Sequence, residues 1–324
     1  MKVAVYERFG GPEVLQCVDL PRPDPADDEI LIKVHATTVT AAECQMRRRR
    51  PLWGRLILGV RRPRRRRRRL GLELAGKVVS VGKDVRRFIP GAKVFGFTGF
   101  GTGANAEYVC MAQSGSVETM PSNVGFDDAA ALVDGPSTAL YFLRDKAHVR
   151  PGQSVLINGA SGSIGTSAVQ LARYFGAEVT AVCSVRNAEL VRSLGADHVI
   201  DYTVEDFTRR CDHYDVIFDT IGASSFARCR GALTKDGRYL ATTGLANWPR
   251  MWWTAVRSGR KVITGMSVDK RELLGVVKDL VETGELVAVI DRGYPFEQLA
   301  EAHRYVEQGH KRGNVTISVA ATSA

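Results

Sequence analysis

Residues 159–165 form a glycine-rich run whose residue types and spacing suit the binding of phosphate groups. The run reads Gly-Ala-Ser-Gly-Ser-Ile-Gly and lies between an apolar segment and a segment with helical spacing. Gly162 lets the backbone approach a pyrophosphate, and Gly165 lets the following helix pack closely on the preceding strand. Amides at the start of that helix then face the phosphate charge. The run predicts a dinucleotide site, with a plain glycine turn as the alternative. The expected contact residues are Ala160, Ser161, Gly162, Ser163, Ile164 and Gly165.

The next apolar segment, Glu178–Cys183, ends without the carboxylate that binds the ribose in many NAD sites. Ser184, Arg186 and Asn187 follow it, and the first acidic residue is Glu189. A hydroxyl, a guanidinium and an amide suit a phosphate on the ribose 2′-oxygen instead. We therefore expect NADP(H) as the cofactor, bound in part by Ser184 and Arg186. The alternative is a solvated loop with an incidental arginine.

The glycine-rich run belongs to a stretch in which short apolar segments alternate with helical ones. This alternation begins near Asp127 and is typical of crossover units around a parallel sheet. The first 110 residues instead carry short strand-like segments separated by turn signals such as Gly10-Gly11-Pro12. We therefore expect an α/β fold that combines a doubly wound parallel sheet with a β-rich domain. The expected strands are residues 3–5, 29–36, 76–81, 93–97, 154–158, 178–183, 198–201, 216–219, 239–242 and 315–319, and late helices are expected at 270–283 and 296–308.

Composition limits the class of protein. Of the 324 residues, 44% are hydrophobic and 25% are charged, which is typical of a globular protein. No run of about 18 apolar residues occurs, so we expect no membrane-spanning helix. The six cysteines contain no Cys-x-x-Cys pair, and the first residues lack the apolar core of a signal peptide. This pattern suits reduced thiols, so we expect a cytoplasmic location.

The net charge of +10 comes from one segment of the chain. Residues 47–69 contain 13 arginines and no acidic residue, so the rest of the chain is mildly acidic. The simplest interpretation is an insertion with solvated charges. Apolar residues at helical spacing between the arginines leave two alternatives, contact with an anionic membrane surface or with nucleic acid.

Motifs spread over nearly the whole chain point to one superfamily. They are Gly10-Gly11-Pro12-Glu13-Val14-Leu15, Leu70-Gly71-x-Glu73-x-Ala75-Gly76, Ala106-Glu107-Tyr108-Val109, the glycine-rich run, Leu194-Gly195-Ala196-Asp197 and Asp215-Val216-Ile217-Phe218-Asp219. With these motifs the chain resembles the medium-chain dehydrogenase/reductase superfamily, and within it the zinc-independent quinone oxidoreductases related to zeta-crystallin. The resemblance implies a GroES-like catalytic domain in residues 1–122. It also implies a Rossmann NADP(H)-binding domain in residues 123–265 and a return to the catalytic domain in residues 266–324.

The resemblance also implies roles for single residues. Thr138 would hydrogen-bond near the nicotinamide, Tyr202 would lie against the adenine or its phosphate, and Gly244 would let the backbone approach the nicotinamide. The alternatives are a helix-start hydroxyl, a surface tyrosine and a plain turn glycine.

Three positions that hold the catalytic metal in zinc-dependent relatives are matched here by Thr40, Leu72 and Asp134. Because leucine cannot bind zinc, we expect no metal at this site.

Without zinc, no Lewis acid polarises the oxygen of an isolated ketone. A quinone or an α,β-unsaturated carbonyl needs this help less, because its conjugated system spreads the incoming charge to its own oxygen. We therefore expect an NADPH-dependent enzyme that transfers hydride to such a small-molecule substrate. A tyrosine of several relatives is missing from residues 40–45, which leaves Thr40, Glu43, Gln45 or a water as the proton donor. Thr40 and Glu43 are the candidate catalytic residues.

Three alternatives to this function remain. Two are enzymes of the same superfamily, an alcohol dehydrogenase and an enoyl reductase. The third is a cofactor-binding protein that acts on a membrane surface or RNA through residues 47–69. We also expect a homodimer.

Overall fold

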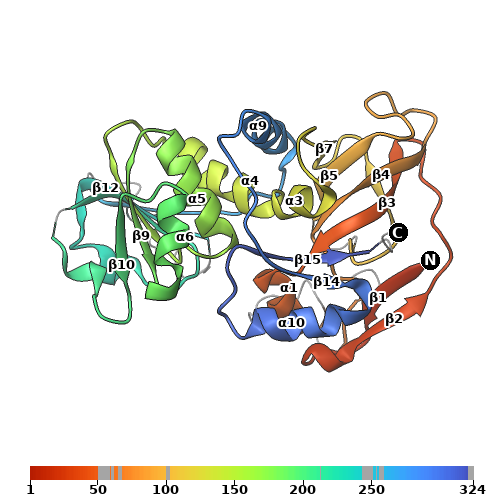
Figure 1. The fold of residues 1–324 in the computed structure, drawn as a ribbon, viewed down its shortest axis with the longest axis horizontal. Coiled ribbons are helices and arrows are strands. Elements are labelled where there is room, and N and C mark those ends of the chain that lie inside the picture. The colour runs from red at the N-terminus through yellow and green to blue at the C-terminus, as the bar shows by residue number, and fades with distance from the viewer. Residues whose placement is uncertain are drawn as a thin grey trace. The chain divides into compact units, whose positions relative to one another are not determined.

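The computed structural model describes residues 1–49, 59, 62–64, 68–99, 103–211, 213–242, 251, 252, 254 and 259–319. The chain divides into two compact units, drawn as ribbons in Figure 1. Unit 1 consists of Met1–Asp134, Val268–Thr283 and Ala288–Ala324, and unit 2 consists of Gly135–Ser267 and Gly284–Val287. In the described part of the chain, no helix has both the length and the apolar character needed to span a bilayer.

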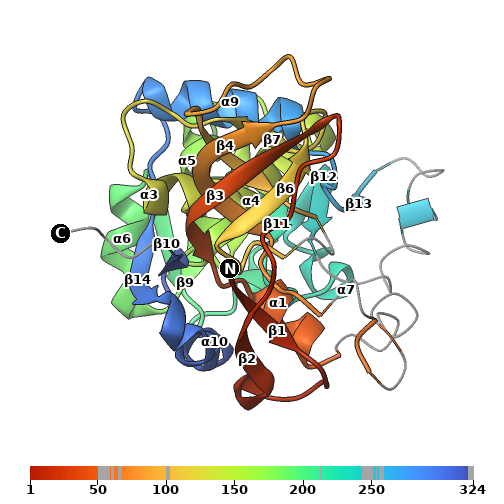
Figure 2. The same ribbon diagram turned by 90° about the vertical axis from the view of Figure 1, so that its right-hand side faces the viewer.

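Unit 1 is built on a sheet of seven described strands. Their order is β14-β15-β3-β4-β5-β7, and β6 pairs with β3 as well. All of these pairs are antiparallel except β14 with β15. Figure 2 shows β3, β4 and β6 lying side by side. A separate antiparallel pair joins β1 and β2. The strands are β1 Lys2–Tyr6, β2 Leu15–Asp19, β3 Glu29–Thr38, β4 Glu73–Val81, β5 Lys93–Phe97, β6 Tyr108–Ala112, β7 Val117–Thr119, β14 Ile290–Pro295 and β15 Asn314–Ser318.

The core of unit 1 is formed by apolar residues that alternate along these strands and by the inner faces of helices. On β3, Ile30, Ile32 and Val34 are buried together with Val315 and Ile317 of β15. Burying apolar surface of this kind contributes about 25 cal/mol for each Å² removed from water. The helical elements are α1 Ala41–Arg47, α3 Phe126–Ala131, α9 Arg271–Glu282 and α10 Leu299–Glu307, with 3-10 turns at Pro12–Val14 and Phe296–Gln298.

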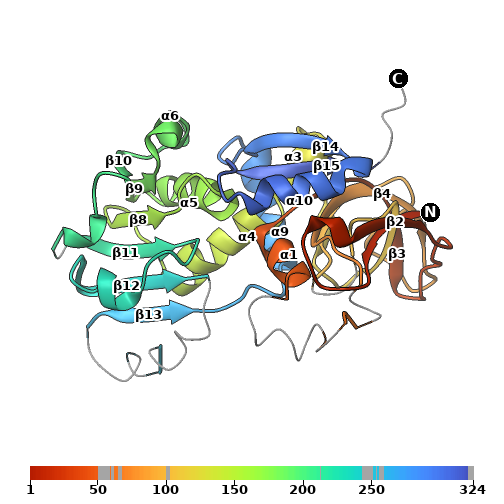
Figure 3. The same cartoon turned by 90° about the horizontal axis from the view of Figure 1, so that it is seen from below.

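Unit 2 is built on a parallel sheet of six described strands in the order β10-β9-β8-β11-β12-β13, which Figure 3 shows in sequence. The chain leaves the centre in one direction from β8 and in the other from β11, so the strand order reverses between these two strands. The strands are β8 Ser154–Asn158, β9 Glu178–Cys183, β10 His198–Asp201, β11 Tyr214–Asp219, β12 Leu233–Ala241 and β13 Lys261–Thr264. The helical elements are α4 Asp134–Leu140, the π-helical turn Tyr141–Lys146, α5 Ser163–Tyr174, α6 Ala188–Ser193 and α7 Phe226–Cys229, with 3-10 turns at Val185–Asn187 and Phe207–Arg209.

The expected fold class is confirmed, because a doubly wound parallel sheet is combined with a β-rich unit. The expected bounds of β5, β8, β9 and β10 match the structure to the residue. Strands β2, β6, β7, β13 and β14 were not expected from the sequence.

Candidate functional site

The glycine-rich loop of unit 2 connects the end of β8 to the start of α5. Gly159 has a φ angle of +80°, which side chains other than glycine rarely adopt. A Cβ atom on Gly165 would lie 2.1 Å from the carbonyl oxygen of Gly159, so α5 can begin this close to the strand only with glycine there. A Cβ atom on Gly162 would meet its nearest atom at 3.5 Å, an ordinary contact. Packing therefore does not require glycine at position 162, and the space beside it is available to a ligand.

The start of α5 is suited to an anion. Its N-cap residue, Gly162, has an extended backbone and makes no side-chain cap hydrogen bond, and the first turn contains no acidic residue. The first amides of any helix lack partners within the helix and carry the positive end of its dipole. In α5 neither the cap nor the first turn supplies a carboxylate that would compete for these amides, and such helix N-termini bind phosphate.

The start of α4 packs directly against this loop. A Cβ atom on Gly135 would lie 2.8 Å from the carbonyl oxygen of Ser163, so the two helix starts are in close contact. Thr138 lies one turn later on α4 and is 9% exposed. The structure thus brings Thr138 onto a helix that touches the glycine-rich loop. Gly244, the other residue expected near the nicotinamide, lies outside the described residues.

Three exposed apolar side chains follow the carboxyl ends of neighbouring strands in the parallel sheet. Val185 follows β9, Tyr202 follows β10 and Ile221 follows β11, and their exposed fractions lie between 57% and 72%. Ligands of open parallel sheets bind outside this edge, near the point where the strand order reverses. In this sheet the reversal lies between β8 and β11, so the three side chains offer apolar surface to a planar ring where such ligands bind.

One side chain links the glycine-rich loop to the end of β9. Asn187, 4% exposed, donates from Nδ2 to Ser161 Oγ over 3.0 Å and to Ser184 Oγ over 3.5 Å. Arg186 precedes it in the same 3-10 turn, with its residue exposed to solvent. Ser161, Ser184 and Arg186 were expected from the sequence as contacts to two different phosphates. The structure brings the two serines together around Asn187, and Arg186 lies in the 3-10 turn that carries Asn187.

Asp219 at the end of β11 shapes the loop that follows. Its Oδ1 accepts hydrogen bonds from Asn158 Nδ2 over 3.1 Å and from the Gly222 amide over 3.0 Å. Its Oδ2 accepts from the Ser224 amide over 3.0 Å and from the Tyr239 hydroxyl over 2.9 Å. The carboxylate is 0% exposed, so it stabilises the loop and is not available for proton transfer to a ligand.

Thr40 and Glu43, the candidate catalytic residues, form a capping box at the start of α1 in unit 1. The Thr40 hydroxyl accepts from the Glu43 amide over 3.1 Å, and Glu43 Oε2 accepts from the Thr40 amide over 2.9 Å and from its hydroxyl over 3.2 Å. Glu43 Oε1 accepts from the Gly71 amide over 2.6 Å and from Asn105 Nδ2 over 3.3 Å. Glu43 is 0% exposed, and burial raises its pKa to about 7 although these donors oppose the shift. Glu43 therefore holds Thr40, which is half-buried, in a fixed orientation.

A second buried carboxylate, Glu73 at the start of β4, was missed by the sequence reasoning. Its Oε1 accepts from the Asp134 amide over 2.6 Å, and its Oε2 accepts from the Thr38 hydroxyl. Burial and the neighbouring charge of Asp134 raise the pKa of Glu73. Lys270 Nζ lies 2.8 Å from Asp134 Oδ1 and 5.0 Å from the centre of the Phe97 ring, and its side chain is 1% exposed. The sequence signal that could have revealed this cluster is a glutamate directly before the apolar residues at the start of β4.

The three positions matched to zinc ligands do not fit a catalytic zinc. Leu72 is apolar and 4% exposed, Thr40 is bonded within its capping box, and Asp134 faces the ammonium of Lys270. Across the residues that the structure describes, no three His, Cys, Asp or Glu side chains are grouped as metal ligands. The cation beside Asp134 is a lysine ammonium.

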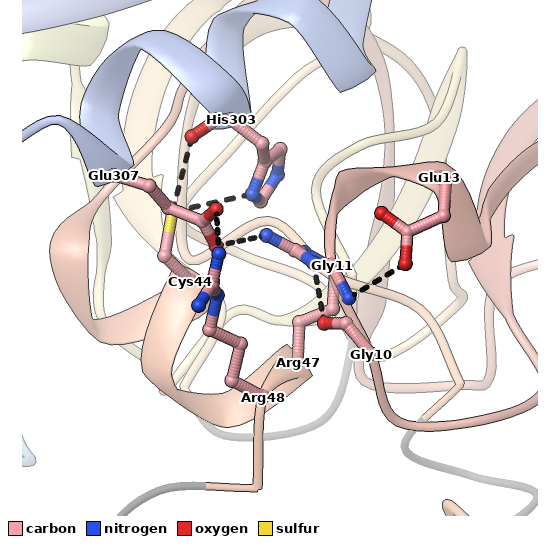
Figure 4. A network of polar contacts seen from close by, with 8 residues as sticks. All are labelled: Gly10, Gly11, Glu13, Cys44, Arg47, Arg48, His303 and Glu307. Atoms are coloured by element: carbon pink, nitrogen blue, oxygen red, sulfur yellow. Dashed lines mark hydrogen bonds and ion pairs between the residues drawn. The ribbon is translucent and has the colours of Figure 1, made fainter.

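The first arginine of the arginine-rich segment, Arg47, contacts both Gly10 and Glu307, as Figure 4 shows. Arg47, the last residue of α1, is 0% exposed, and its NH1 donates to the Gly10 carbonyl over 2.6 Å. Its NH2 donates to Glu307 on α10, and Arg48 donates to the same carboxylate over 2.6 and 2.8 Å. The interpretation of residues 47–69 as solvated charges is therefore wrong for Arg47, since this guanidinium is buried and paired. Most of the segment lies outside the described residues.

A buried thiol and imidazole lie beside Arg47. Cys44 Sγ is 3.3 Å from His303 Nδ1. Burial raises the pKa of Cys44 to about 12, and burial together with the charge of Arg47 lowers the pKa of His303 to about 3. Both groups are therefore neutral at physiological pH, and the pair packs α1 against α10 without an activated nucleophile.

Two family models match the chain. Residues 26–122 match the alcohol dehydrogenase GroES-like domain, and residues 194–317 match the family described as zinc-binding dehydrogenase.

Relatives match nearly the full chain. A chloroplast envelope quinone oxidoreductase homolog from Arabidopsis thaliana is 30% identical, with 98% of each chain covered. A mitochondrial NAD(P)H oxidoreductase from Mus musculus is 32% identical, with 98% of this chain and 89% of the relative covered. The solved structure of the quinone oxidoreductase from Coxiella burnetii has a TM-score of 0.88 at 28% identity, with 99% of each chain covered.

Proposed function

Because this chain belongs to the medium-chain dehydrogenase/reductase superfamily, in its quinone oxidoreductase branch, we propose that it transfers hydride from NADPH to a quinone or an α,β-unsaturated carbonyl. The observation that carries the proposal is the glycine-rich loop at the reversal point of the parallel sheet, where only glycine fits at position 165. The names of relatives support a nicotinamide cofactor and a conjugated acceptor, because they include an NAD(P)H oxidoreductase and a chloroplastic NADPH-dependent alkenal/one oxidoreductase. Bound NADPH supplies the hydride from its nicotinamide ring.

In this proposal the residues of unit 2 hold the cofactor. The first amides of α5 bind the pyrophosphate, and the exposed ring of Tyr202 covers the adenine. The apolar surface at Val185 and Ile221 excludes water from the adenine face. The proposed contacts are Thr138, Ala160, Ser161, Gly162, Ser163, Ile164, Gly165, Ser184, Arg186, Tyr202 and Gly244.

We propose NADPH rather than NADH because the end of β9 offers donors and no carboxylate. The Ser184 hydroxyl and the Arg186 guanidinium would donate to a 2′-phosphate, whose oxygens can only accept. Arg186→Glu is expected to weaken NADPH binding by about 10- to 150-fold, since a hydrogen bond to a charged group contributes roughly 1.5–3 kcal/mol. The NADH affinity should change much less. Arg192→Glu, which alters an exposed arginine on α6, is the matched control and should leave the NADPH-to-NADH affinity ratio unchanged.

On the substrate side, we propose that the Thr40 hydroxyl donates a proton to the oxygen that becomes negative when hydride is added. The capping box fixes this hydroxyl, and Glu43 is its positioning residue. When Glu43 is protonated, its Oε2 would donate to the Thr40 hydroxyl, the reverse of the direction in which the ionised carboxylate accepts, so that the Thr40 hydrogen can pass to the substrate and be replaced from Glu43. The pKa of Glu43, about 7, suits the return of a proton at neutral pH. No step passes through zinc, because the residues at the three matched positions do not fit it.

The proposal is tested by following NADPH oxidation with a panel of quinones and enones. Turnover is expected with at least one conjugated acceptor, and Thr40→Val should lower kcat more than it raises KM. If NADPH binds but no conjugated acceptor is reduced, the proposal is wrong. Oxidation of a simple alcohol with NADP⁺ would instead favour an alcohol dehydrogenase.

A further inference from the structure

Asn187 is too deeply buried to touch a cofactor, yet its amide contacts two proposed phosphate-binding residues. It is 4% exposed, whereas Ser161 and Ser184 are both partly exposed. The same nitrogen, Nδ2, donates to both hydroxyl oxygens, over 3.0 and 3.5 Å. Two serines from different loops are therefore gathered around one atom.

The direction of these hydrogen bonds determines what the serines can do. A hydroxyl has one hydrogen to donate and two lone pairs that accept. Because each hydroxyl already accepts from Asn187, each keeps its own hydrogen for another partner. Phosphate oxygens only accept, so two hydroxyls in this state are matched to a phosphate.

The orientation of the amide agrees with this direction. Asn187 Oδ1 is buried and has no hydrogen-bond partner among the described residues. Turning the amide over would place Oδ1 against the serines, where it would take up their hydrogens, and would leave two buried N–H groups unpaired instead of one oxygen. The observed orientation therefore leaves fewer polar atoms unsatisfied and also leaves the serines free to donate.

We propose that Asn187 is the positioning residue of the 2′-phosphate site, which orients the hydroxyls of Ser161 and Ser184 as donors to the phosphomonoester beside Arg186. This inference rests on the proposed NADPH-dependent function and extends it. It accounts for selectivity, because a cofactor without the 2′-phosphate offers these two hydrogens only a neutral hydroxyl oxygen, a weaker acceptor than a charged phosphate.

The test measures dissociation constants for NADPH, NADH, adenosine 2′,5′-bisphosphate and 5′-AMP at pH 8. Asn187→Ala is expected to weaken NADPH and the bisphosphate about tenfold, the effect of losing about 1.4 kcal/mol, and to change NADH and AMP by less than about twofold. Asn187→Asp should weaken NADPH further, because a carboxylate takes the hydrogens of both serines and repels the phosphate. Ser193→Ala, which removes an exposed hydroxyl bonded to a carbonyl of α6, is the control and should change none of the four constants.

A second measurement separates positioning from a general loss of structure. In a chain that carries both Ser161→Ala and Ser184→Ala, adding Asn187→Ala should have no further effect on NADPH binding. The role of Asn187 would be overturned if Asn187→Ala weakened NADPH and NADH binding equally, or if it weakened neither. It would also be overturned if Asn187→Ala weakened NADPH binding about tenfold in the chain that already lacks both serine hydroxyls. A wild type that does not prefer NADPH would overturn the proposed cofactor and this inference with it. A wild-type preference that Asn187→Ala leaves undiminished would overturn this inference alone.

Discussion

Removal of the Glu307 carboxylate should destabilise the protein strongly, because it leaves the buried guanidinium of Arg47 without its ion-pair partner. Arg47 is 0% exposed, and in the described part of the chain the neutral Gly10 carbonyl accepts from it besides Glu307. Breaking a buried ion pair from one side costs about 3–5 kcal/mol. The bond between Glu307 and Arg48 adds little to this loss, because Arg48 is 46% exposed and exposed pairs contribute about 0–1 kcal/mol. We therefore expect Glu307→Ala to lower the free energy of unfolding by about 3–5 kcal/mol.

The assay is urea unfolding followed by circular dichroism. The dependence of the unfolding free energy on urea concentration should be the same in all variants. Arg47→Met is expected to cost less than Glu307→Ala, because it removes the buried charge and leaves Glu307 paired with Arg48. Glu301→Ala, at an exposed position on the same helix, is the control and should stay within about 0.5 kcal/mol of the wild type. If Glu307→Ala costs no more than Glu301→Ala, the reasoning about a buried and charged Arg47 is refuted.

Three further predictions concern the two candidate sites. Gly162→Ala should leave thermal stability unchanged while weakening NADPH binding, whereas Gly165→Ala should lower both, because its Cβ would lie 2.1 Å from a carbonyl oxygen; equal loss of stability in the two variants would contradict this. The pKa of Glu43 is about 7 in the folded state and near 4.5 in the unfolded chain, so the folded state holds this proton more tightly. As the pH rises from 4.5 to about 7, the wild type should therefore lose up to about 3 kcal/mol of unfolding free energy relative to Glu43→Gln. A difference between the two variants that does not change with pH would show that folding does not raise the pKa of Glu43. Elemental analysis should find no zinc and a chelator should not reduce activity, since Thr40 and Leu72 stand at ligand positions; about one zinc per chain would contradict this.

Much of unit 2 could be predicted from the sequence because its signals are local. The strands β8, β9 and β10 are short apolar runs bounded by turn-forming or polar residues, and their expected bounds are the observed ones. The spacing of glycines in the glycine-rich loop, between a strand and a helix, is typical of dinucleotide sites. By contrast, β14 contains Asp291, Arg292 and Gly293, so its sequence does not read as a strand, and it forms only by pairing with β15 at the edge of the sheet.

The buried charges could not be predicted, because their partners are distant in the sequence. Arg47 begins a run of four arginines, and only its helical phase distinguishes it from the next three. Glu43, Cys44 and Arg47 share the buried face of α1, so Arg47 points inward to Glu307 on α10. A sequence pattern assigns charges to the surface unless a partner is known. The hydrogen bond from Asn187 to Ser161 also could not be predicted, because the two residues lie in different loops that are distant in the sequence.

The position of β15 has a consequence for folding of the chain during its synthesis on the ribosome. Residues Thr316, Ile317 and Ser318 pair with Thr38, Thr37 and Ala36 of β3, although the main segment of unit 2 separates the two strands in the sequence. The nascent chain must therefore carry part of β3 as an open edge until β15 emerges, while Gly135–Ser267 can already fold. An unpaired edge is a template for wrong pairing, and such long-range pairing is slow to form. Translational pausing between residue 267 and β15 would prolong this exposure, so the yield of native protein should depend on how quickly codons 268–318 are read.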